Sequence, residues 1–351
     1  MTAFERLPKT SADAVAASFR SMAPALGRNG ARLYAMLCSR IPDDPELVAI
    51  TAHGLAAYPA LQLLAAVHFL LLRDPRDPLA QYYSNLTERP LPPEEAFPVF
   101  SRFCKSHREE ILQIVKTRTI QATTVERCQL IMPMLSYIAD MAGEPLDLIE
   151  IGCSAGVLLT FDKYAYDLKG RGVLGPQNAP LTLNVEVQGG PALHIPKIGK
   201  RIGLDLCPID VKLEDERRWL LAHFYPEGVE LQTRLAKAMD VVARTDIQIF
   251  EGDALDLLPG LIAKTPGPLC VYHSACVVYW SDEAKAQLES QLLQASHRRE
   301  IFRIGLEPEL AQPAKPFMEI VLSRYRDGAV DSTIIAHAPN TADLAIVRWL
   351  D

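Results

Sequence analysis

The segment LDLIEIGCSAGVLLTFDKY, residues 146–164, holds a short apolar strand, a turn with two glycines and the start of a helical pattern. Its turn, Gly152-Cys-Ser-Ala-Gly156, matches G-x-S-x-G, the nucleophile elbow of the α/β-hydrolases, in which Ser154 would be the nucleophile. The same turn follows a strand and opens a helix, as a loop that binds a nucleotide cofactor does. The sequence on either side has to distinguish a catalytic serine from a cofactor site.

From Pro145 onward, short apolar segments of strand length alternate with longer helical segments. The strand-like segments include LDLIEI, KRIGLD, IQIFEGD, LCVYHS and IFRIGLEPE, and EDERRWLLAHF and SDEAKAQLESQLLQAS are among the helical ones. This alternation is typical of a parallel sheet with helices on both faces. The last segments, FMEIVLSRYRDG and AIVRWL, have no strong helix between them, and we expect an antiparallel pair at the sheet edge.

Up to about Met141 the apolar residues recur at helical spacing, although one helix has to accommodate Pro133. We therefore expect a helical N-terminal domain, residues 1–141, and an α/β domain, residues 142–351, with an open, doubly wound, Rossmann-like sheet. Residues 170–200 form an insertion rich in Gly and Pro. Its segment LTLNVEVQGGPALHI predicts a β-hairpin that turns at Gly189-Gly190.

Composition excludes several classes of protein. Apolar residues make up 49% of the 351 residues and charged residues 23%, which allows a substantial core. The formal net charge of −7 argues against binding nucleic acid mainly through phosphate neutralisation. Seven scattered cysteines without a C-x-x-C pair indicate neither a disulfide framework nor a zinc ribbon, and no metal-binding motif is present. The chain shows no secretory leader and no apolar run of about 20 residues, so we expect a cytoplasmic protein that does not use a membrane.

The hydrolase interpretation fits the surrounding sequence poorly. A nucleophile elbow lies in mid-sheet, but the residues before Ser154 have a helical pattern, and His53-Gly54 is not followed by the glycines of an oxyanion loop. A triad could be completed downstream by Asp253 or Asp282 with His297 or His337. In a chain with eight histidines this is weak support, and the hydrolase stays an alternative.

The cofactor interpretation fits better, because acidic residues recur at the ends of the expected strands. Glu150 ends the first strand, and Asp205 ends RIGLD, where its carboxylate could accept hydrogen bonds from ribose hydroxyls. Asp253 ends IQIFEGD, where its carboxylate and the N–H of Ala254 could meet an adenine edge. Ligands of open α/β sheets bind beyond the carboxyl ends of the strands. We therefore expect a cofactor above the turn at residues 152–156.

The turn favours S-adenosylmethionine (SAM) over a dinucleotide. The dinucleotide fingerprint G-x-G-x-x-G needs its middle glycine for close approach of the pyrophosphate, and here Ser154 stands at that position. SAM has no phosphate, so a serine is tolerable. The separation of Glu150 and Asp205, 205 − 150 = 55 residues, exceeds the roughly 20 of a simple βαβ unit, and the insertion accounts for most of the excess.

The chain also resembles known families. The part from Pro145 onward resembles a class I SAM-dependent methyltransferase, which implies a seven-stranded sheet that ends in an antiparallel pair. The whole chain resembles a bacterial family of unknown function, number 2332, through the segments AAVHFLLLRDPRDPLAQYY, TRTIQATTVER, PLDLIEIGCSAGVLLTFDKYAYD, RIGLDLCPID, RRWLLAHFYPE and RLAKAM. That resemblance implies a methyltransferase-like core and no settled substrate.

Two departures from that family bear on activity. Relatives usually have an Asn after the glycine turn, where this chain has Leu158 or Leu159, and tend to have Q-T-N-E in place of residues 121–124. If these polar residues contact cofactor or substrate, this member binds something different or has lost activity. A non-catalytic protein that binds SAM or a nucleotide, such as a sensor, is therefore the main alternative to a methyltransferase for a small-molecule acceptor.

Substrate contacts are expected after the strand LCVYHS and ahead of the first strand. His273 could be a general base or a hydrogen-bonded histidine at a strand end. Tyr279 either lines the pocket or is buried in the core, and Glu307 follows a strand and could face substrate. Gln121 and Arg127 either cover the pocket or form a solvated helix face.

Overall fold

The computed structural model describes residues 11–54, 59–121, 123–143, 145–308, 317–339 and 345–350. The described residues divide into two compact units. The first lies within Met1–Ala122 and Asp210–Ala236, and the second within Thr123–Ile209 and Lys237–Asp351. The sequence predicted a division after residue 141. The last helix of the predicted helical half instead belongs to the second unit. Residues 210–236 of the expected α/β half belong to the first.

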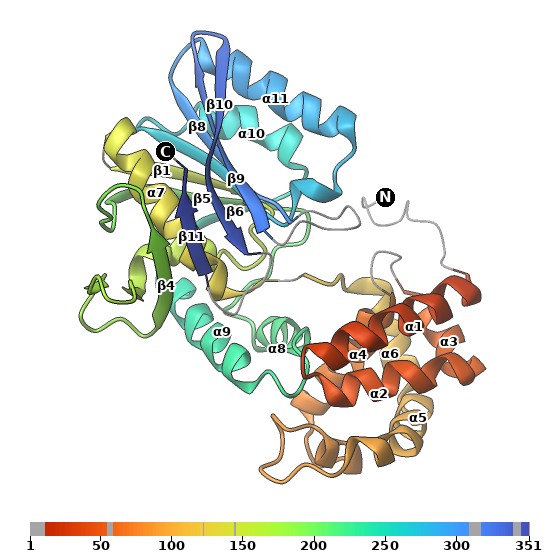
Figure 1. Ribbon diagram of the computed structural model, residues 1–351. Coiled ribbons are helices and arrows are strands. Elements are labelled where there is room, and N and C mark those ends of the chain that lie inside the picture. The colour runs from red at the N-terminus through yellow and green to blue at the C-terminus, as the bar shows by residue number, and fades with distance from the viewer. Residues whose placement is uncertain are drawn as a thin grey trace. The chain divides into compact units, whose positions relative to one another are not determined.

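The first unit is helical (Figure 1). Its α-helices are α1 Ala12–Arg28, α2 Arg32–Arg40, α3 Pro45–Thr51, α4 Pro59–Arg73, α5 Ala96–Ser106, α6 Arg108–Thr117, α8 Glu214–Ala222 and the first part of α9 Val229–Val242, and its 3-10 helices are η2 Ile41–Asp43, η3 Pro78–Tyr82 and η4 Pro93–Glu95. Side chains mark the helix starts: Ser11 accepts a hydrogen bond from the N–H of Ala14, and Asp44 caps α3 just before Pro45.

Helix α4 is the centre of the first unit, because nearly all of its residues are buried. His68 on α4 is a satisfied core histidine, with Nδ1 3.2 Å from the Tyr34 hydroxyl and Nε2 2.9 Å from Asn85 Nδ2. Trp219 on α8 packs edge-on against Phe69 of α4 and donates from Nε1 to a backbone oxygen. This packing explains why residues 210–236 belong to the helical unit.

The described residues of the second unit contain one mixed sheet of eleven strands. The strand order is β3-β2-β4-β11-β10-β9-β8-β7-β1-β5-β6. The bounds are β1 Leu146–Ile151, β2 Ala165–Asp167, β3 Val173–Leu174, β4 Thr182–Gln188, β5 Ile198–Asp205, β6 Gln248–Glu251, β7 Leu269–Ser274, β8 Ile301–Leu306, β9 Phe317–Arg326, β10 Ala329–Pro339 and β11 Ala345–Trp349. A mixed α/β chain with a helical N-terminal region is thus confirmed.

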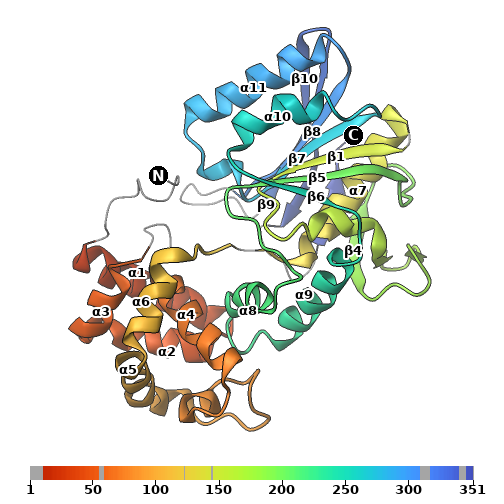
Figure 2. The ribbon, with the colours of Figure 1, turned by 180° about the vertical axis from the view of Figure 1, so that it is seen from behind.

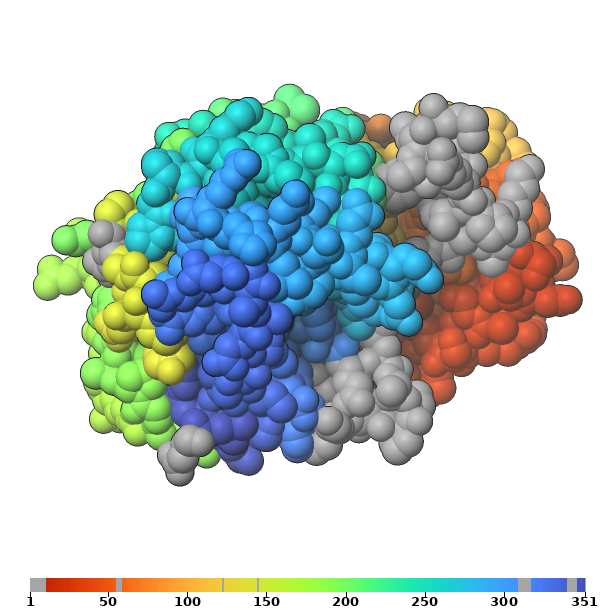
Figure 3. Space-filling view, turned by 90° about the horizontal axis from the view of Figure 1, so that it is seen from above, coloured from red at the N-terminus to blue at the C-terminus, as the bar shows by residue number. Residues whose placement is uncertain are grey.

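Five strands, in the order β6-β5-β1-β7-β8, are mutually parallel. Ile149 and Ile151 of β1 pack with α10 Ala254–Ile262 and α11 Asp282–Ser296 in one buried core. Figures 1 and 2 show α10 and α11 together over one face of the sheet and α7 Cys128–Ala142 on the other. In the space-filling view, residues around 250–300, coloured teal to light blue, form a continuous surface on this unit (Figure 3). Helix α7 accommodates Pro133, as expected.

The sheet differs from the sequence-based expectation at its far side. The expected pairing of FMEIVLSRYRDG with AIVRWL does not form, because AVDSTIIAHAP forms β10 after the Asp327-Gly328 turn and lies between them, antiparallel to both. The last segment, β11, pairs antiparallel with β10 and parallel with β4. The sheet therefore exceeds seven strands, because β4 and its neighbours from the insertion extend it beyond β11.

The segment after the glycine turn also differs from expectation. In place of a long α-helix, residues 158–163 form the 3-10 helix η6 Leu158–Lys163, and β2 follows. The expected hairpin at Gly189-Gly190 does not form, because residues 191–197 have no strand and β4 pairs with β2 and β11. Gly190 instead allows Trp349 to pack closely, since a Cβ there would overlap the indole ring. None of the described helices combines the length and the apolar character needed to cross a membrane.

Candidate functional site

The turn after β1 is held tightly against its neighbours. Gly152 and Gly156 have φ of +74° and +73°, and Ser154 has φ of +51°, a left-handed conformation that is uncommon for a residue with a side chain. The N–H of Gly152 donates to the Leu204 oxygen of β5 at 2.8 Å. A Cβ on Gly152 would lie 2.7 Å from Cys276 Cβ, so only glycine fits between β1 and the segment after β7.

Asp205 ties this turn to the end of β5. Its Oδ2 accepts from the N–H of Ser154 at 2.7 Å, and its Oδ1 accepts from the N–H of Cys207 at 2.9 Å. Burial raises the pKa of Asp205, and these two N–H donors act in the opposite direction. Each oxygen uses one of its two lone pairs in this way, so the carboxylate can still accept further hydrogen bonds.

Asp253 and Ala254 stand at the start of α10, next to Asp205. The backbone oxygen of Asp205 accepts from the N–H of Gly252 at 2.9 Å, which joins the ends of β5 and β6. The exposed Asp253 caps α10 by accepting from the N–H of Leu255 at 2.8 Å, and Ala254 is buried. The structure therefore gives Asp253 a helix-capping role, and a contact with adenine stays a prediction.

Glu150 is buried at the end of β1. Its Oε2 accepts from the Tyr272 hydroxyl of the neighbouring strand β7 at 3.2 Å. Burial raises the pKa of Glu150 well above its ordinary value, and Asp205 raises it further, while the Tyr272 hydrogen bond and the charge of Arg127 lower it. Along β1, alternate side chains point to opposite faces, so Glu150 points away from the core that contains Ile149 and Ile151.

Arg127 lies at the end of the 3-10 helix η5 Val125–Arg127, just before α7. Its Nη1 donates to the Ser274 oxygen at the end of β7, at 3.3 Å. Burial lowers the pKa of Arg127, and the nearby carboxylates of Glu307 and Glu150 oppose that shift. The second unit thus brings together a guanidinium and the acidic ends of β1 and β8, which are far apart in sequence.

Glu307 organises the turn after β7. Its carboxylate accepts from the backbone N–H groups of Cys276 at 3.0 Å, Val277 at 3.2 Å and Val278 at 3.1 Å. This turn bends at Ala275, where φ is +50°, and continues as the 3-10 helix η7 Val277–Tyr279. Tyr279 is 56% exposed, so it is not a core residue.

His273 is buried between two charged side chains. Its Nδ1 lies 2.5 Å from Glu307 Oε1, and Arg303 Nε lies 3.2 Å from its Nε2. Because the guanidinium can only donate, Nε2 is the acceptor and Nδ1 carries the proton that is donated to Glu307. Burial lowers the pKa of His273, although Glu307 opposes this shift. The lone pair that a general base would use therefore accepts from Arg303.

Arg303 was missed in the sequence analysis. Its Nη1 donates to Glu289 at 2.8 Å and to the Tyr325 hydroxyl at 3.1 Å, and that hydroxyl donates to Glu289 at 2.8 Å. A charged residue inside the apolar strand IFRIGL was the available signal. Gly305 was a second signal, since a Cβ there would lie 2.9 Å from the His273 ring.

Gln121 lies in the first unit, whereas all the residues of the site described so far lie in the second. Among the described residues, no group of three or more His, Cys, Asp or Glu side chains could hold a metal ion. The site consists of a glycine turn, carboxylates at strand ends, His273 and the guanidinium groups of Arg127 and Arg303.

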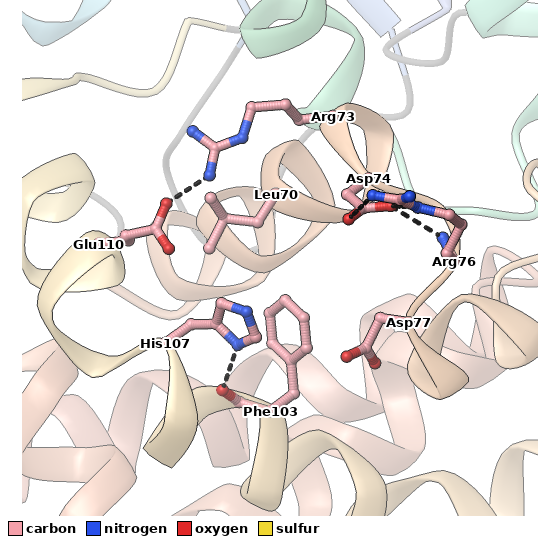
Figure 4. A pocket seen from close by; sticks show the side chains of 8 residues that line it. All are labelled: Leu70, Arg73, Asp74, Arg76, Asp77, Phe103, His107 and Glu110. Atoms are coloured by element: carbon pink, nitrogen blue, oxygen red, sulfur yellow. Dashed lines mark hydrogen bonds and ion pairs between the residues drawn. The ribbon is translucent and has the colours of Figure 1, made fainter.

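The first unit has a pocket of its own, of about 610 Å³ (Figure 4). Its two arginines are paired with carboxylates: Arg73 with Glu110, and Arg76 with Asp74. The His107 ring stacks on Phe103 with 4.1 Å between centroids. The lining residues are Leu70, Arg73, Asp74, Arg76, Asp77, Phe103, His107 and Glu110. Because the guanidinium groups already have carboxylate partners, this pocket indicates no particular ligand.

A family model described as "Uncharacterized protein conserved in bacteria (DUF2332)" matches residues 16–344, most of the chain. No curated protein matches it. The match agrees with the segments that suggested this relationship in the sequence, and it carries no activity with it.

Proposed function

The chain belongs to the uncharacterised bacterial family DUF2332, and on that premise we propose that it is a SAM-dependent, methyltransferase-like protein that acts on a small-molecule acceptor. The observation that carries the proposal is the 2.7 Å hydrogen bond from the Ser154 N–H to Asp205. It joins the glycine turn after β1 to the acid at the end of β5. Open α/β sheets bind their ligands at such a place, beyond the carboxyl ends of neighbouring parallel strands.

The strand order supports the same proposal. Strands β6-β5-β1-β7-β8 are parallel, and β9 is antiparallel to β8. We propose that these strands together with β10 are a methyltransferase-like core of seven strands, and that β11, β4, β2 and β3 extend it. The extension starts beyond β10, at the edge farthest from Asp205.

The donors and acceptors of the site fit the cofactor. Asp205 keeps lone pairs for ribose hydroxyls, and Gly152 exposes backbone because no Cβ fits there. Asp253 and Ala254 would meet the adenine edge. Bound SAM would supply an electrophilic methyl group. The chain would hold and orient the reactants and exclude water, which is the main catalytic contribution that methyl transfer requires.

General-base catalysis by His273 stays a prediction. It requires that Arg303 release Nε2 when the acceptor binds, because that nitrogen now accepts from the guanidinium. A pH–rate profile that loses its acid limb in His273→Gln would support the role. An unchanged profile would leave His273 as a positioning residue for Glu307.

Isothermal titration calorimetry with SAM tests the proposed function. We expect measurable binding by the wild type and at least tenfold weaker binding by Asp205→Ala, a loss of about 1.4 kcal/mol. Asp256→Ala is the matched control, because Asp256 is an exposed acid on α10 near the site. Asp205→Asn keeps one acceptor for the turn and separates the loss of ribose contacts from a loosened turn. Failure of the folded wild type to bind SAM would reject the proposal.

A non-catalytic SAM- or nucleotide-binding protein is the second candidate. The observation that favours it is the engaged lone pair of His273, since the site then lacks a ready base. SAM binding without turnover on any small-molecule acceptor would support this candidate.

A serine hydrolase is the third candidate, and the left-handed φ of Ser154 favours it. Nucleophile elbows place their serine on a strained turn after a strand. Labelling of the wild type but not of Ser154→Ala by a fluorophosphonate probe would support a hydrolase. Absence of labelling would exclude it.

A further inference from the structure

Arg127 has unused hydrogen-bonding capacity. A guanidinium carries five N–H donors, and the described residues give it one hydrogen bond, the 3.3 Å contact with the Ser274 oxygen. When an arginine pairs with a carboxylate, the pair frequently forms two parallel hydrogen bonds. The structure therefore leaves a forked donor at the carboxyl end of β7 that is matched by one weak acceptor.

The two nearest carboxylates are committed elsewhere. The Glu307 oxygens accept from His273 and from three backbone N–H groups of the turn after β7. Glu150 accepts from Tyr272. Both lie close enough to act on the pKa of Arg127, yet neither forms an ion pair with it among the described residues. The Glu307 carboxylate favours the charged guanidinium without occupying its donors.

From this geometry we infer that Arg127 binds the carboxylate of a small ligand beside the glycine turn. This inference rests on the proposed function and deepens it, because it names a charged group that the ligand must have. The carboxylate has two possible sources: the methionine part of SAM, or an acceptor that is itself a carboxylic acid. The guanidinium fork suits either one, since both present two oxygens in a plane.

The first arm of the test changes protein and ligand together. SAM and decarboxylated SAM differ in the carboxylate alone, so their affinities for the wild type, Arg127→Met and Arg127→Lys are measured by calorimetry. If the cofactor supplies the carboxylate, the wild type prefers SAM at least tenfold and Arg127→Met removes that preference. Arg127→Lys keeps the charge but loses the fork, and is expected to be intermediate. Arg171→Met, at an exposed arginine of the same unit, is the matched control.

The second arm tests the acceptor as the source. Benzoate is titrated into each protein at saturating SAM. Binding to the wild type that is at least tenfold weaker in Arg127→Met, together with equal affinities for SAM and decarboxylated SAM, assigns the carboxylate to the acceptor. If Arg127→Met changes none of these affinities, the inference is overturned while the proposed function stands. If the folded wild type binds neither form of SAM, the proposed function fails, and benzoate binding then tests Arg127 separately. Arg127→Lys keeps the test interpretable should Arg127→Met not fold.

Discussion

At the scale of single residues, Gly152 shows most directly how the turn after β1 depends on its neighbours. Its φ of +74° suits glycine, and the space where a Cβ would lie is filled by the Cys276 side chain. Either reason alone would disfavour another residue. Together they explain how the turn and the segment after β7 can meet closely at this point.

Replacing Gly152 by alanine separates backbone strain from steric overlap. Gly170→Ala is the matched control, because Gly170 has a φ of +91° with open space around it. We expect Gly170→Ala to lower the free energy of unfolding by roughly 1–2 kcal/mol, from strain alone. Gly152→Ala should cost about 1–3 kcal/mol more, because the added methyl overpacks the site. Urea unfolding measures both, and equal losses would show that the overlap with Cys276 is relieved without cost.

Glu150 makes stability depend on pH. Its pKa in the folded protein is raised above the ordinary 4.5, so the folded state holds this proton more tightly than the unfolded state. The contribution of Glu150 is therefore most favourable below about pH 4.5 and is lost as the pH rises toward the folded pKa. Each pKa unit of difference corresponds to about 1.4 kcal/mol.

Glu150→Gln removes this titration and keeps an acceptor for Tyr272. We expect the variant to gain stability relative to the wild type as the pH rises from 4.5 to 8, and to be at least as stable at neutral pH. Urea unfolding of both proteins across this range gives the difference, in which all other titrating groups cancel. A difference that does not change with pH would contradict a raised pKa for Glu150.

At the scale of elements, α8 lies between two strands of the α/β unit in the sequence, but it packs in the core of the helical unit. It lies in the crossover between the parallel strands β5 and β6, yet its Trp219 packs on Phe69 of α4 and donates to the Thr119 oxygen at 3.0 Å. Arg118 lies over the rings of both Trp219 and Phe69. A crossover connection has thus become part of the helical unit.

Trp219→Ala should therefore destabilise the first unit. The loss of a fully buried indole ring is expected to cost about 3–5 kcal/mol. In hydrogen exchange, the amides of α4 and α6 should exchange faster, while those of β1 and β7 keep their rates. Leu213→Ala, at a residue of the same crossover that is 56% exposed, should leave both sets unchanged. Faster exchange in β1 and β7 alone would place α8 with the sheet instead.

At the scale of the whole molecule, two units with different architectures share one chain that passes between them more than once. The helical unit has α4 at its centre, and the α/β unit has a core between β1, β5, β7 and the helices α10 and α11. The candidate site lies wholly in the second unit. Binding of a ligand there stabilises directly the residues that contact it.

Hydrogen exchange with and without SAM tests how far that stabilisation extends. At a concentration a hundred times the dissociation constant, SAM should add about 2.7 kcal/mol to the stability of the state that binds it. We expect slower exchange in β1, β5 and β7 and unchanged exchange in α2 and α5. Equal protection of both units would show that they open as one cooperative structure.

The parallel core could be predicted because its central strands β1 and β7 are buried on both faces and are mainly apolar. Strands β10 and β2 could not be predicted from the sequence. Half of β10 is exposed, and its segment AVDSTI has no clear alternation, so its pairing with β9 and β11 holds it. Strand β2 has three residues and exists through its bonds with β4 and β3. Short or exposed strands depend on partners that a local pattern does not reveal.

The acidic ends of β1, β5 and β8 follow from the order of residues alone, since the ends of parallel strands meet at one edge of a sheet. Which of these acids are engaged depends on distances that only the folded chain sets. Glu307 accepts hydrogen bonds from the turn at residues 276–278. His273 accepts a hydrogen bond from Arg303, which is thirty residues away along the chain. The register of β7 with β8 brings that pair together. Strand positions are encoded locally, whereas side-chain partners depend on register and packing between distant segments.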